Sequence, residues 1–477
     1  MDPKGASKVQ KVRTSMLMMC AVMLGVVWLV PSSGSAQTYD ADIRPLIDEN
    51  CVGCHSPEGL AFSMEDSEDT YERRRDISRM VTGRRMPPWL AEAGHQQYEG
   101  DLSLSEAEVD RVKQWADAGF PRGAPYRQTV SPRNAMAFES DMTLEILPGA
   151  SYLPNQTRFD DYRCFVVDWP GNEPLYITGF GTTPGNALVS HHTVVYAVDA
   201  AVRERFHELA EAEEGHGYEC FGGALPDRIL QRDERAAYEA EYPNGVRELA
   251  NGNYWLAHWA PGMFGQAFPE ETGILMEPGG ALVVQMHYYS ADAPGESDAG
   301  TKLAFQTAES VARPAFHFQQ TSNEWLDARE NGSMVIPVGE KGTFEVTETL
   351  GDWLGYVSFV TKVPREEIVG LDLHSANLHM HANGHSGVIT LQGGEAENEV
   401  LLNVPRWDLR WQRDFMFTAP KTFDVDALDD THITVQCTFE NLTEETVYGG
   451  FGSDEEMCFN FSYIAVRTAP DSGHQEH

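Results

Sequence analysis

The chain has 477 residues, of which 42% are hydrophobic and 23% charged, and its formal net charge is -38. This length is too great for one ordinary core, so we expect two or three domains, and the composition is that of a folded protein. A charge this negative argues against a nucleic-acid partner and disfavours binding to anionic lipid.

The N-terminus is typical of an export signal. Lysines and an arginine between residues 4 and 13 form a basic stretch, residues 15–30 are apolar, and Gly34-Ser-Ala36 supplies small residues for cleavage. We predict a signal peptide over residues 1–36 and a periplasmic or secreted protein, exported by a bacterium, with no stable membrane insertion after cleavage. An uncleaved anchor is the alternative, because the apolar run is close to membrane-spanning length.

Residues 37–128 are predicted to form a small α-helical, cytochrome c-like domain. Cys51-Val-Gly-Cys54-His55 has the spacing of covalent c-type haem attachment, in which two thiols bond to the haem and the next histidine ligates iron. A zinc or redox site at the two cysteines would need further ligands, which the neighbouring sequence lacks. The last helix is predicted to begin at the capping box Ser105-Glu-Ala-Glu108 and to stop before Gly119.

The second iron ligand is predicted to be Met86. It lies in Arg84-Arg-Met-Pro-Pro-Trp89, where two prolines restrict the backbone of a loop that must aim one side chain. Met80 is the alternative, but its helical spacing with Ile77 and Val81 favours a role in core packing.

After a linker rich in proline and glycine over residues 121–132, the chain consists of short apolar runs such as 193–196, 281–286 and 357–360, separated by turn residues. Many short strands favour β-sandwiches, and the remaining length is too great for one. We therefore predict two all-β sandwiches, residues 129–308 and 309–467, followed by a polar tail over 468–477.

The Ala/Glu-rich stretch 201–252 interrupts the first sandwich and is expected to be an insertion with helices over 202–212 and 233–242. His207 and His216 lie within it and are assigned to a solvated face, because the sequence after His207 lacks the second histidine of a zinc-protease motif.

Four cysteines of the exported chain remain beside the haem motif: Cys164, Cys220, Cys437 and Cys458. An even number in an exported protein predicts two disulfides, for which three pairings are formally open. Pairing within each sandwich favours Cys164 with Cys220 and Cys437 with Cys458.

Histidines at three places could hold metal ions. If residues 378–382 form a strand, His379 and His381 project to one face as a two-point chelator, although such a pair can also be an unligated surface pair. His191 and His192 are adjacent, so a strand would send them to opposite faces unless a bulge or twist intervenes. His287 ends an apolar run, where a lone histidine is more often structural.

Met457, beside Cys458, is either a core residue or a thioether ligand of the kind that favours Cu(I). Imidazole ligands alone do not identify the metal, because they bind copper, zinc, nickel and iron.

Four stretches together resemble the copper type II, ascorbate-dependent monooxygenases, a family that includes peptidylglycine α-hydroxylating and dopamine β-monooxygenases. In chain order they are Val189-Ser-His-His-Thr-Val-Val-Tyr196, Leu282-Val-Val-Gln-Met-His-Tyr288, His379-Met-His381 and Ser453-Asp-Glu-Glu-Met-Cys458. The resemblance covers about residues 135–467 and implies two jelly-roll-like sandwiches with one copper each, facing across an open cleft.

The resemblance assigns His191, His192 and His287 to the copper that supplies an electron, and His379, His381 and Met457 to the catalytic copper that binds O2. The favoured cysteine pairs also fall at family disulfide positions.

The chain departs from peptide-amidating members of the family at two positions. Asn377 replaces an arginine that holds a substrate carboxylate, and Phe461 lacks the hydroxyl of the aromatic residue found there. The substrate is therefore not transferred from the family. His258, His374 and His385 flank the motifs and are expected to be structural or to support the ligands.

The resulting hypothesis is an exported copper monooxygenase with two copper ions and one covalent haem, which hydroxylates a C–H bond of a small organic substrate with O2. The haem is expected to relay electrons from an external donor, ascorbate or a redox protein, to the copper at His191, His192 and His287. The alternative is a non-catalytic electron-transfer or copper-binding protein. A hydrolase has little support, because the sequence contains no Gly-x-Ser-x-Gly and no His-Glu-x-x-His.

Overall fold

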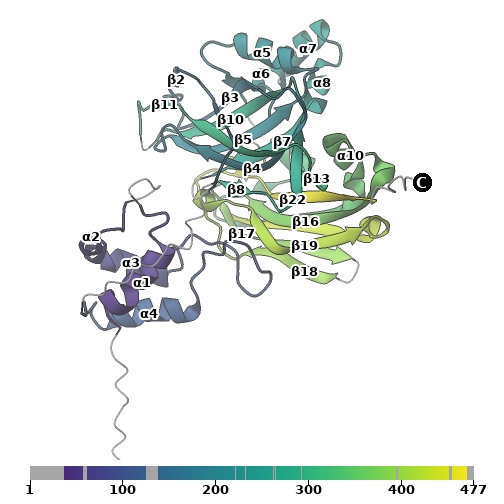
Figure 1. Cartoon of the computed structure of the whole chain (residues 1–477). Coiled ribbons are helices and arrows are strands. Elements are labelled where there is room, and N and C mark those ends of the chain that lie inside the picture. The colour runs from purple at the N-terminus through teal and green to yellow at the C-terminus, as the bar shows by residue number, and fades with distance from the viewer. Residues whose placement is uncertain are drawn as a thin grey trace, which may run out of the picture.

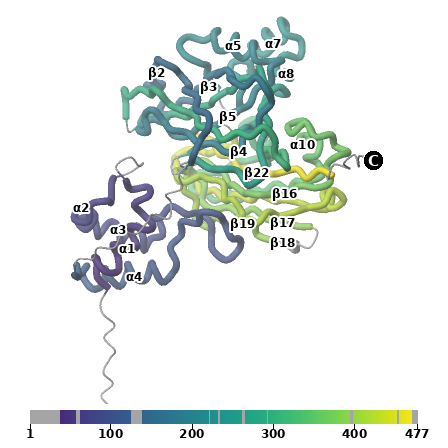
Figure 2. The backbone as a smooth tube through the Cα atoms, viewed as in Figure 1, coloured from purple at the N-terminus to yellow at the C-terminus, as the bar shows by residue number. Residues whose placement is uncertain are grey.

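The structure is a computed structural model that describes residues 37–56, 62–124, 138–220, 222–230, 232–260, 263, 265–291, 293–393, 396–450 and 454–469. The predicted signal peptide, most of the predicted linker and most of the polar tail lie outside these residues. Figures 1 and 2 show a helical N-terminal unit beside two stacked β units. None of the helices in the described ranges combines the length and the apolar character needed to cross a membrane.

The N-terminal unit contains η1 (Tyr39–Ile43), α1 (Arg44–Asn50), α2 (Ser67–Glu72), α3 (Arg74–Thr82) and α4 (Glu106–Asp117). Their apolar side chains surround a small core in which Tyr39, Ile47 and Trp115 are fully buried. The helix α4 begins at the predicted capping box, where Ser105 and Glu108 each accept a hydrogen bond from the backbone of the other.

Residues 83–105, which we call the arm, leave this unit, reach the second β unit and return to α4. The backbone N–H groups of Glu92 and Glu99 donate to carbonyls of the second β unit, each over 2.8 Å. Tyr98 is 7% exposed, and its hydroxyl donates to the Leu401 carbonyl over 2.7 Å. The arm therefore fixes the helical unit against the second β unit, a contact that the sequence did not predict.

A carboxylate also anchors the arm. Gln96 donates to Glu399 over 2.8 Å, and the Lys421 ammonium lies 2.6 Å from the same carboxylate. Burial alone would raise the pKa of Glu399, but the hydrogen bonds from Lys421 and Gln96 outweigh it and lower that pKa below its ordinary value.

The first β unit has an antiparallel sheet in the order β6-β3-β10-β5-β7. Its strands are β3 (Asp160–Asp168), β5 (Ser190–Val198), β6 (Tyr218–Glu219), β7 (Asn253–Trp259) and β10 (Ala281–Tyr289). Because side chains alternate along a strand, Val195 and Val284 face the sandwich interior, whereas Val194 and Val283 face the opposite side.

The insertion covers that opposite side. It carries α5 (Arg203–Glu211), α6 (Asp227–Leu230), α7 (Arg232–Glu241) and α8 (Gly245–Asn251), so the two predicted helices are present, together with two others. His216 is exposed, as predicted, but His207 is half-buried, and its Nε2 lies 2.9 Å from the Asp168 carboxylate.

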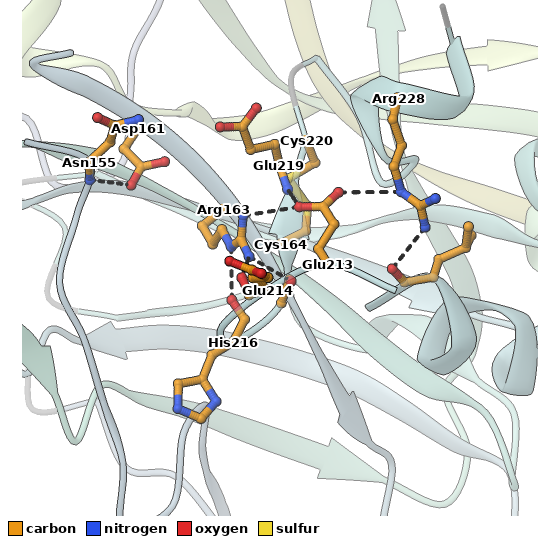
Figure 3. Close-up of polar contacts among 12 residues, drawn as sticks. Asn155, Asp161, Arg163, Cys164, Glu213, Glu214, His216, Glu219, Cys220 and Arg228 are labelled. Atoms are coloured by element: carbon orange, nitrogen blue, oxygen red, sulfur yellow. Dashed lines mark hydrogen bonds and ion pairs between the residues drawn. A yellow bond between two sulfur atoms is a disulfide. The ribbon is translucent and has the colours of Figure 1, made fainter. Parts of the chain in front are cut away.

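Arg163 of β3 fastens the insertion to the sheet, as Figure 3 shows. Its guanidinium donates to the carbonyls of His216 and Gly217, each over 2.8 Å, and pairs with Glu213 over 3.1 Å. Next to it, Cys164 and Cys220 form the first of the two predicted disulfides.

The second β unit packs two sheets face to face. One contains β13 (Arg313–Gln320), β22 (Phe459–Thr468), β16 (Ile368–His379) and β19 (Phe415–Asp424), and the other contains β15 (Lys341–Thr349), β20 (His432–Glu440), β17 (Gly384–Gly393) and β18 (Ala396–Val404). The second predicted disulfide, Cys437–Cys458, joins β20 to the residue that precedes β22. Residues 357–360 were wrongly predicted as a strand: they lie in α10 (Leu354–Thr361), because a short apolar run suits a buried helix equally well.

One sheet runs through both β units. The strands β1 (Met142–Glu145), β12 (Lys302–Ala308), β4 (Leu175–Thr183) and β9 (Thr272–Met276) continue into β13, β22, β16 and β19, and β8 (Gln266–Ala267) pairs with β4. The connection is a short parallel pairing of β9 with β13, which the Arg313 side chain supports by donating to the Glu270 carbonyl and to Asp372. The predicted division at residues 308/309 falls between β12 and β13, but the sequence did not predict the shared sheet.

Candidate metal centres

His191, His192 and His287 converge at one end of β5 and β10. Their three Nδ1 atoms lie 3.3, 3.1 and 3.2 Å apart. Ligand atoms of a tetrahedral ion with bonds of about 2.0 Å lie roughly 3.3 Å apart, so the three lone pairs meet at a site of the right size for a transition metal.

A β-bulge brings the two adjacent histidines to one place. In the pairing of β5 with β10, His192 lies opposite His287, and the next pair joins Ser190 to Tyr288. His191 is therefore the extra residue of a bulge, which frees its side chain from the strict alternation of a strand. Two adjacent histidines on a strand can bind one metal only if a bulge or twist turns both side chains to the same place, and this bulge is present.

Neighbouring side chains fix the ring of His287. Its Nε2 donates to Asp160 over 2.8 Å, which leaves Nδ1 unprotonated and available to a metal. The Tyr162 ring stacks on it with centroids 4.1 Å apart. Neither residue was predicted.

Burial keeps the other two histidines of this cluster uncharged. Burial, followed by the neighbouring His287, lowers the pKa of His191 to about 4. Burial, and then nearby imidazoles that include His379 and His381 of the second cluster, lower the pKa of His192 well below its ordinary value.

The second cluster contains His379 and His381, whose ring centroids lie 5.2 Å apart. His379 is the last residue of β16 and His381 lies in the turn that follows, so the predicted strand over 378–382 was wrong beyond His379. The His379 ring donates from Nδ1 to the Gln412 side chain over 2.5 Å, and the His381 ring donates from Nδ1 to the Glu455 carbonyl over 2.9 Å. With Nδ1 as the donor, the lone pair of each neutral ring is on Nε2.

A buried carboxylate connects this turn to the methionine. Glu456 accepts from the backbone N–H groups of His381 and Asn383 over 2.8 and 2.6 Å, and burial raises its pKa to about 7. The next residue, Met457, is 7% exposed and precedes the disulfide-bonded Cys458. Ser453, at the start of this motif, lies outside the described residues.

One cavity joins the two clusters. It encloses about 860 Å³ of space, part of it open to solvent, and is lined by His192 from the first cluster and by His379, His381 and Met457 from the second. Aromatic side chains from both β units, among them Trp255 and Phe461, also line it. The described residues that line the cavity include no lysine, arginine, aspartate or glutamate.

The predicted haem-binding residues lie in the helical unit and the arm. Cys51 and Cys54 are half-buried, neither is in a disulfide, and burial raises the pKa of Cys51 to about 12, which disfavours a reactive thiolate. The Nδ1 of His55 lies 2.9 Å from the Phe62 carbonyl, so it donates there and leaves Nε2 for a metal. Met86 and Met80 are both half-buried, and Met80 lies outside the core cluster that contains Ile77 and Val81.

The flanking histidines have different surroundings. The Nε2 of His385 lies 3.7 Å from Glu440, whereas the Nε2 of His374 has no hydrogen-bond partner among the described residues. His258 borders the cavity and contacts Asp414.

Comparisons with known proteins match the second β unit most directly. Residues 360–469 match the family model described as copper type II ascorbate-dependent monooxygenase, C-terminal domain. This range contains His379, His381 and Met457 but not the first histidine cluster. The match to this family model is therefore confined to the second β unit.

A curated relative, dopamine beta-hydroxylase of Rattus norvegicus, is 24% identical over 316 residues, which are 64% of this chain and 43% of that protein. The chain therefore spans less than half the length of that relative.

Likeness to solved structures is weak. The major capsid protein P2 of bacteriophage PM2 has 6% identity and a TM-score of 0.21 over 70% of this chain and 99% of its own. Cowpea mosaic virus top component has 8% identity and a TM-score of 0.24 over 68% of this chain and 92% of its own. Scores this low carry no argument.

Proposed function

We propose that this protein is a copper-dependent monooxygenase with two copper ions, which hydroxylates a C–H bond of a small organic substrate. The balanced reaction takes substrate, O2, two electrons and two protons to the hydroxylated product and water. The observation that carries the proposal is that His192 of one cluster and His379, His381 and Met457 of the other line the same cavity. The matches to the copper monooxygenase family support the same reading.

The residues of the two clusters suit different tasks. Three imidazoles in the first cluster, with His287 held by Asp160, favour a rigid site that accepts and returns one electron. Two imidazoles and the Met457 thioether in the second favour Cu(I), the form of copper that reacts with O2. Copper, when bound, supplies the one-electron chemistry, and Gln412 and the Glu455 carbonyl orient the rings that hold it.

The cavity favours an uncharged substrate. A substrate carboxylate or ammonium would lose its hydration shell in a cavity whose described lining includes no lysine, arginine, aspartate or glutamate to pair with it. Asn377 is also occupied, because its amide donates to Asp414 over 2.9 Å. We infer an apolar or aromatic substrate that binds in the cavity against Trp255 and Phe461, whose rings pack on each other with centroids 4.9 Å apart.

We further propose that Cys51, Cys54 and His55 hold a covalent haem, with Met86 as the other iron ligand, and that an external donor supplies its electrons. The arm contacts the second β unit: Arg413 lies over the Trp89 ring of the arm at 5.5 Å, and the preceding residue, Gln412, contacts His379. This path favours delivery of electrons to the second cluster, in place of the first cluster that the sequence analysis favoured. The two disulfides are compatible with the proposed export, because such bonds persist in oxidising compartments.

The decisive experiment measures copper per covalent haem in the purified full chain, together with electron paramagnetic resonance and substrate-dependent O2 consumption. We expect two coppers per haem in the wild type. Met457→Leu removes the thioether but keeps the volume, so it should lower O2 consumption at least about 10-fold while the first copper and the haem spectrum stay unchanged. Met334→Leu is the matched control, because Met334 is fully buried and does not line the cavity.

Two outcomes would change the conclusion. Two bound coppers without substrate-dependent O2 consumption, over a panel of neutral aromatic and aliphatic compounds, would favour a copper-binding or electron-transfer protein. Fewer than two coppers after controlled loading would contradict at least one ligand set. The haem relay has its own test: Cys51→Ala with Cys54→Ala should slow turnover with a redox-protein donor but not with a small chemical reductant.

A further inference from the structure

A third group of possible metal ligands lies where the two β units meet. It consists of His258 on β7, His317 on β13 and Asp414 just before β19, and one ligand atom from each lies within 4.8 Å of the others. Figure 1 shows β7 and β13 next to each other at this junction. The group therefore joins one side chain of the first β unit to two of the second.

The histidines of this group lack the partners that buried polar side chains normally have. His317 is 3% exposed, and neither of its ring nitrogens has a hydrogen-bond partner among the described residues. The Nε2 of His258 has only a 3.3 Å contact with Asp414, and its Nδ1 has no hydrogen-bond partner in the described structure. Orphaned buried nitrogens are rare in folded proteins, so a missing ligand is the natural explanation.

The carboxylate of the group is already oriented. The Asn377 amide donates to Oδ1 of Asp414, and Oδ2 points to His258. Burial alone would raise the pKa of Asp414, but His258, His317 and Asn377 hold it at about 2, so Asp414 is ionised. Burial lowers the pKa of His317 to about 3, so that ring is neutral and has a lone pair to donate.

An ion pair between His258 and Asp414 is the competing explanation. An ion pair would give each of those two residues a partner of opposite charge, because Asp414 raises the pKa of His258 against the effect of burial. It would leave His317 buried without a partner, although the centroid of its ring lies 5.5 Å from that of His258. One cation, by contrast, would be shared by all three side chains.

We propose that His258, His317 and Asp414 form a third metal site, for a divalent transition-metal ion that prefers imidazole and carboxylate ligands, as zinc does. Its ligand set differs from the two proposed copper sites, which have no carboxylate ligand. The site ties β7 of the first β unit to β13 and the 412–414 segment of the second. Because Asn377 and Gln412 connect this segment to β16 and His379, the ion also holds one side of the second copper cluster in place.

The test uses the full mature chain loaded with copper and then equilibrated with zinc sulfate, followed by metal analysis and thermal unfolding. The wild type should hold three metal equivalents besides the haem iron. His317→Phe keeps an aromatic ring but removes both nitrogens, so it should lose the third equivalent and keep two coppers. His374→Phe is the matched control, because His374 is also buried on the second β unit, with an unpartnered Nε2, but lies outside the group.

Asp414→Asn provides a second variant should His317→Phe fail to fold, and it should weaken zinc binding at least about 10-fold. Zinc should raise the melting temperature of the copper-loaded wild type and not that of either variant. Two equivalents in the wild type, or a third equivalent that survives both substitutions, would overturn the proposal. Loss of a copper in the wild type would instead count against the proposed function, so the two failures are distinguishable.

Discussion

Replacement of Tyr98 by alanine should release the arm from the second β unit. The Tyr98 ring is 7% exposed and packs edge to face against Trp89 and Phe415, with centroids 6.1 and 5.4 Å away. Truncation of a buried aromatic side chain to alanine costs about 3–5 kcal/mol. Since each 1.4 kcal/mol is about a factor of ten in an equilibrium constant, the arm should open about 100-fold to about 4,000-fold more often.

Amide hydrogen exchange measures this opening directly. The N–H groups of Glu92, Glu99 and Thr418 form hydrogen bonds between the arm and the second β unit, so their exchange reports undocking. Tyr98→Phe keeps the ring but leaves the Leu401 carbonyl without its donor, and should show a smaller effect of about 1–3 kcal/mol. Amides of β10, in the other β unit, serve as the internal control.

The reasoning would be refuted if Glu92 and Glu99 exchanged at wild-type rates in Tyr98→Ala while the melting temperature fell. That result would mean that the Tyr98 ring stabilises the second β unit itself and does not hold the arm.

Three further predictions concern the proposed sites and the arm. Asp160→Ala should lower the copper affinity of the first cluster by about 10- to 100-fold in a Cu(I) competition titration, because His287 loses its orienting acceptor; an equal loss at the second cluster would contradict this. Met86→Ala should lower the haem reduction potential, which a thioether ligand raises, and Met80→Ala should not; the reverse result would exchange their roles. Because the folded-state pKa of Glu399 is depressed, its contribution to docking of the arm is complete above the ordinary value of about 4.5 and is lost as the pH falls through the lowered pKa. The protection factors of the arm amides, which correct for the pH dependence of intrinsic exchange, should therefore fall in acid, but much less so in Glu399→Gln, whose carboxamide does not titrate.

Local sequence patterns predicted the features whose interacting residues are near one another in the sequence or belong to the same domain. The capping box at Ser105 involves residues three apart, and the disulfides followed from counting cysteines within each sandwich. The adjacent pair His191-His192 was interpretable because strand geometry allows joint binding only at a bulge, and a bulge is present.

Contacts between distant parts of the chain could not be predicted in this way. Tyr98 and Leu401 are 303 residues apart, and nothing near either position marks it as part of an interface. Asp160 and Gln412 are ordinary polar residues in the sequence, and their roles appear only when the strands align. His317 lies in an apolar strand, where a single histidine resembles a core residue, and only the absence of hydrogen-bond partners sets it apart.

The two histidine clusters present different ring nitrogens to a metal ion, and this difference sets how far the ion would lie from the backbone. The nitrogen Nδ1 is bonded to the ring carbon nearest the backbone, whereas Nε2 lies at the far edge of the ring. An ion held by three Nδ1 atoms would therefore sit close to the strands β5 and β10, which would restrict its movement. An ion held through Nε2 of His379 and His381 would stand a ring width further from the backbone, on the side of the cavity that these two residues line.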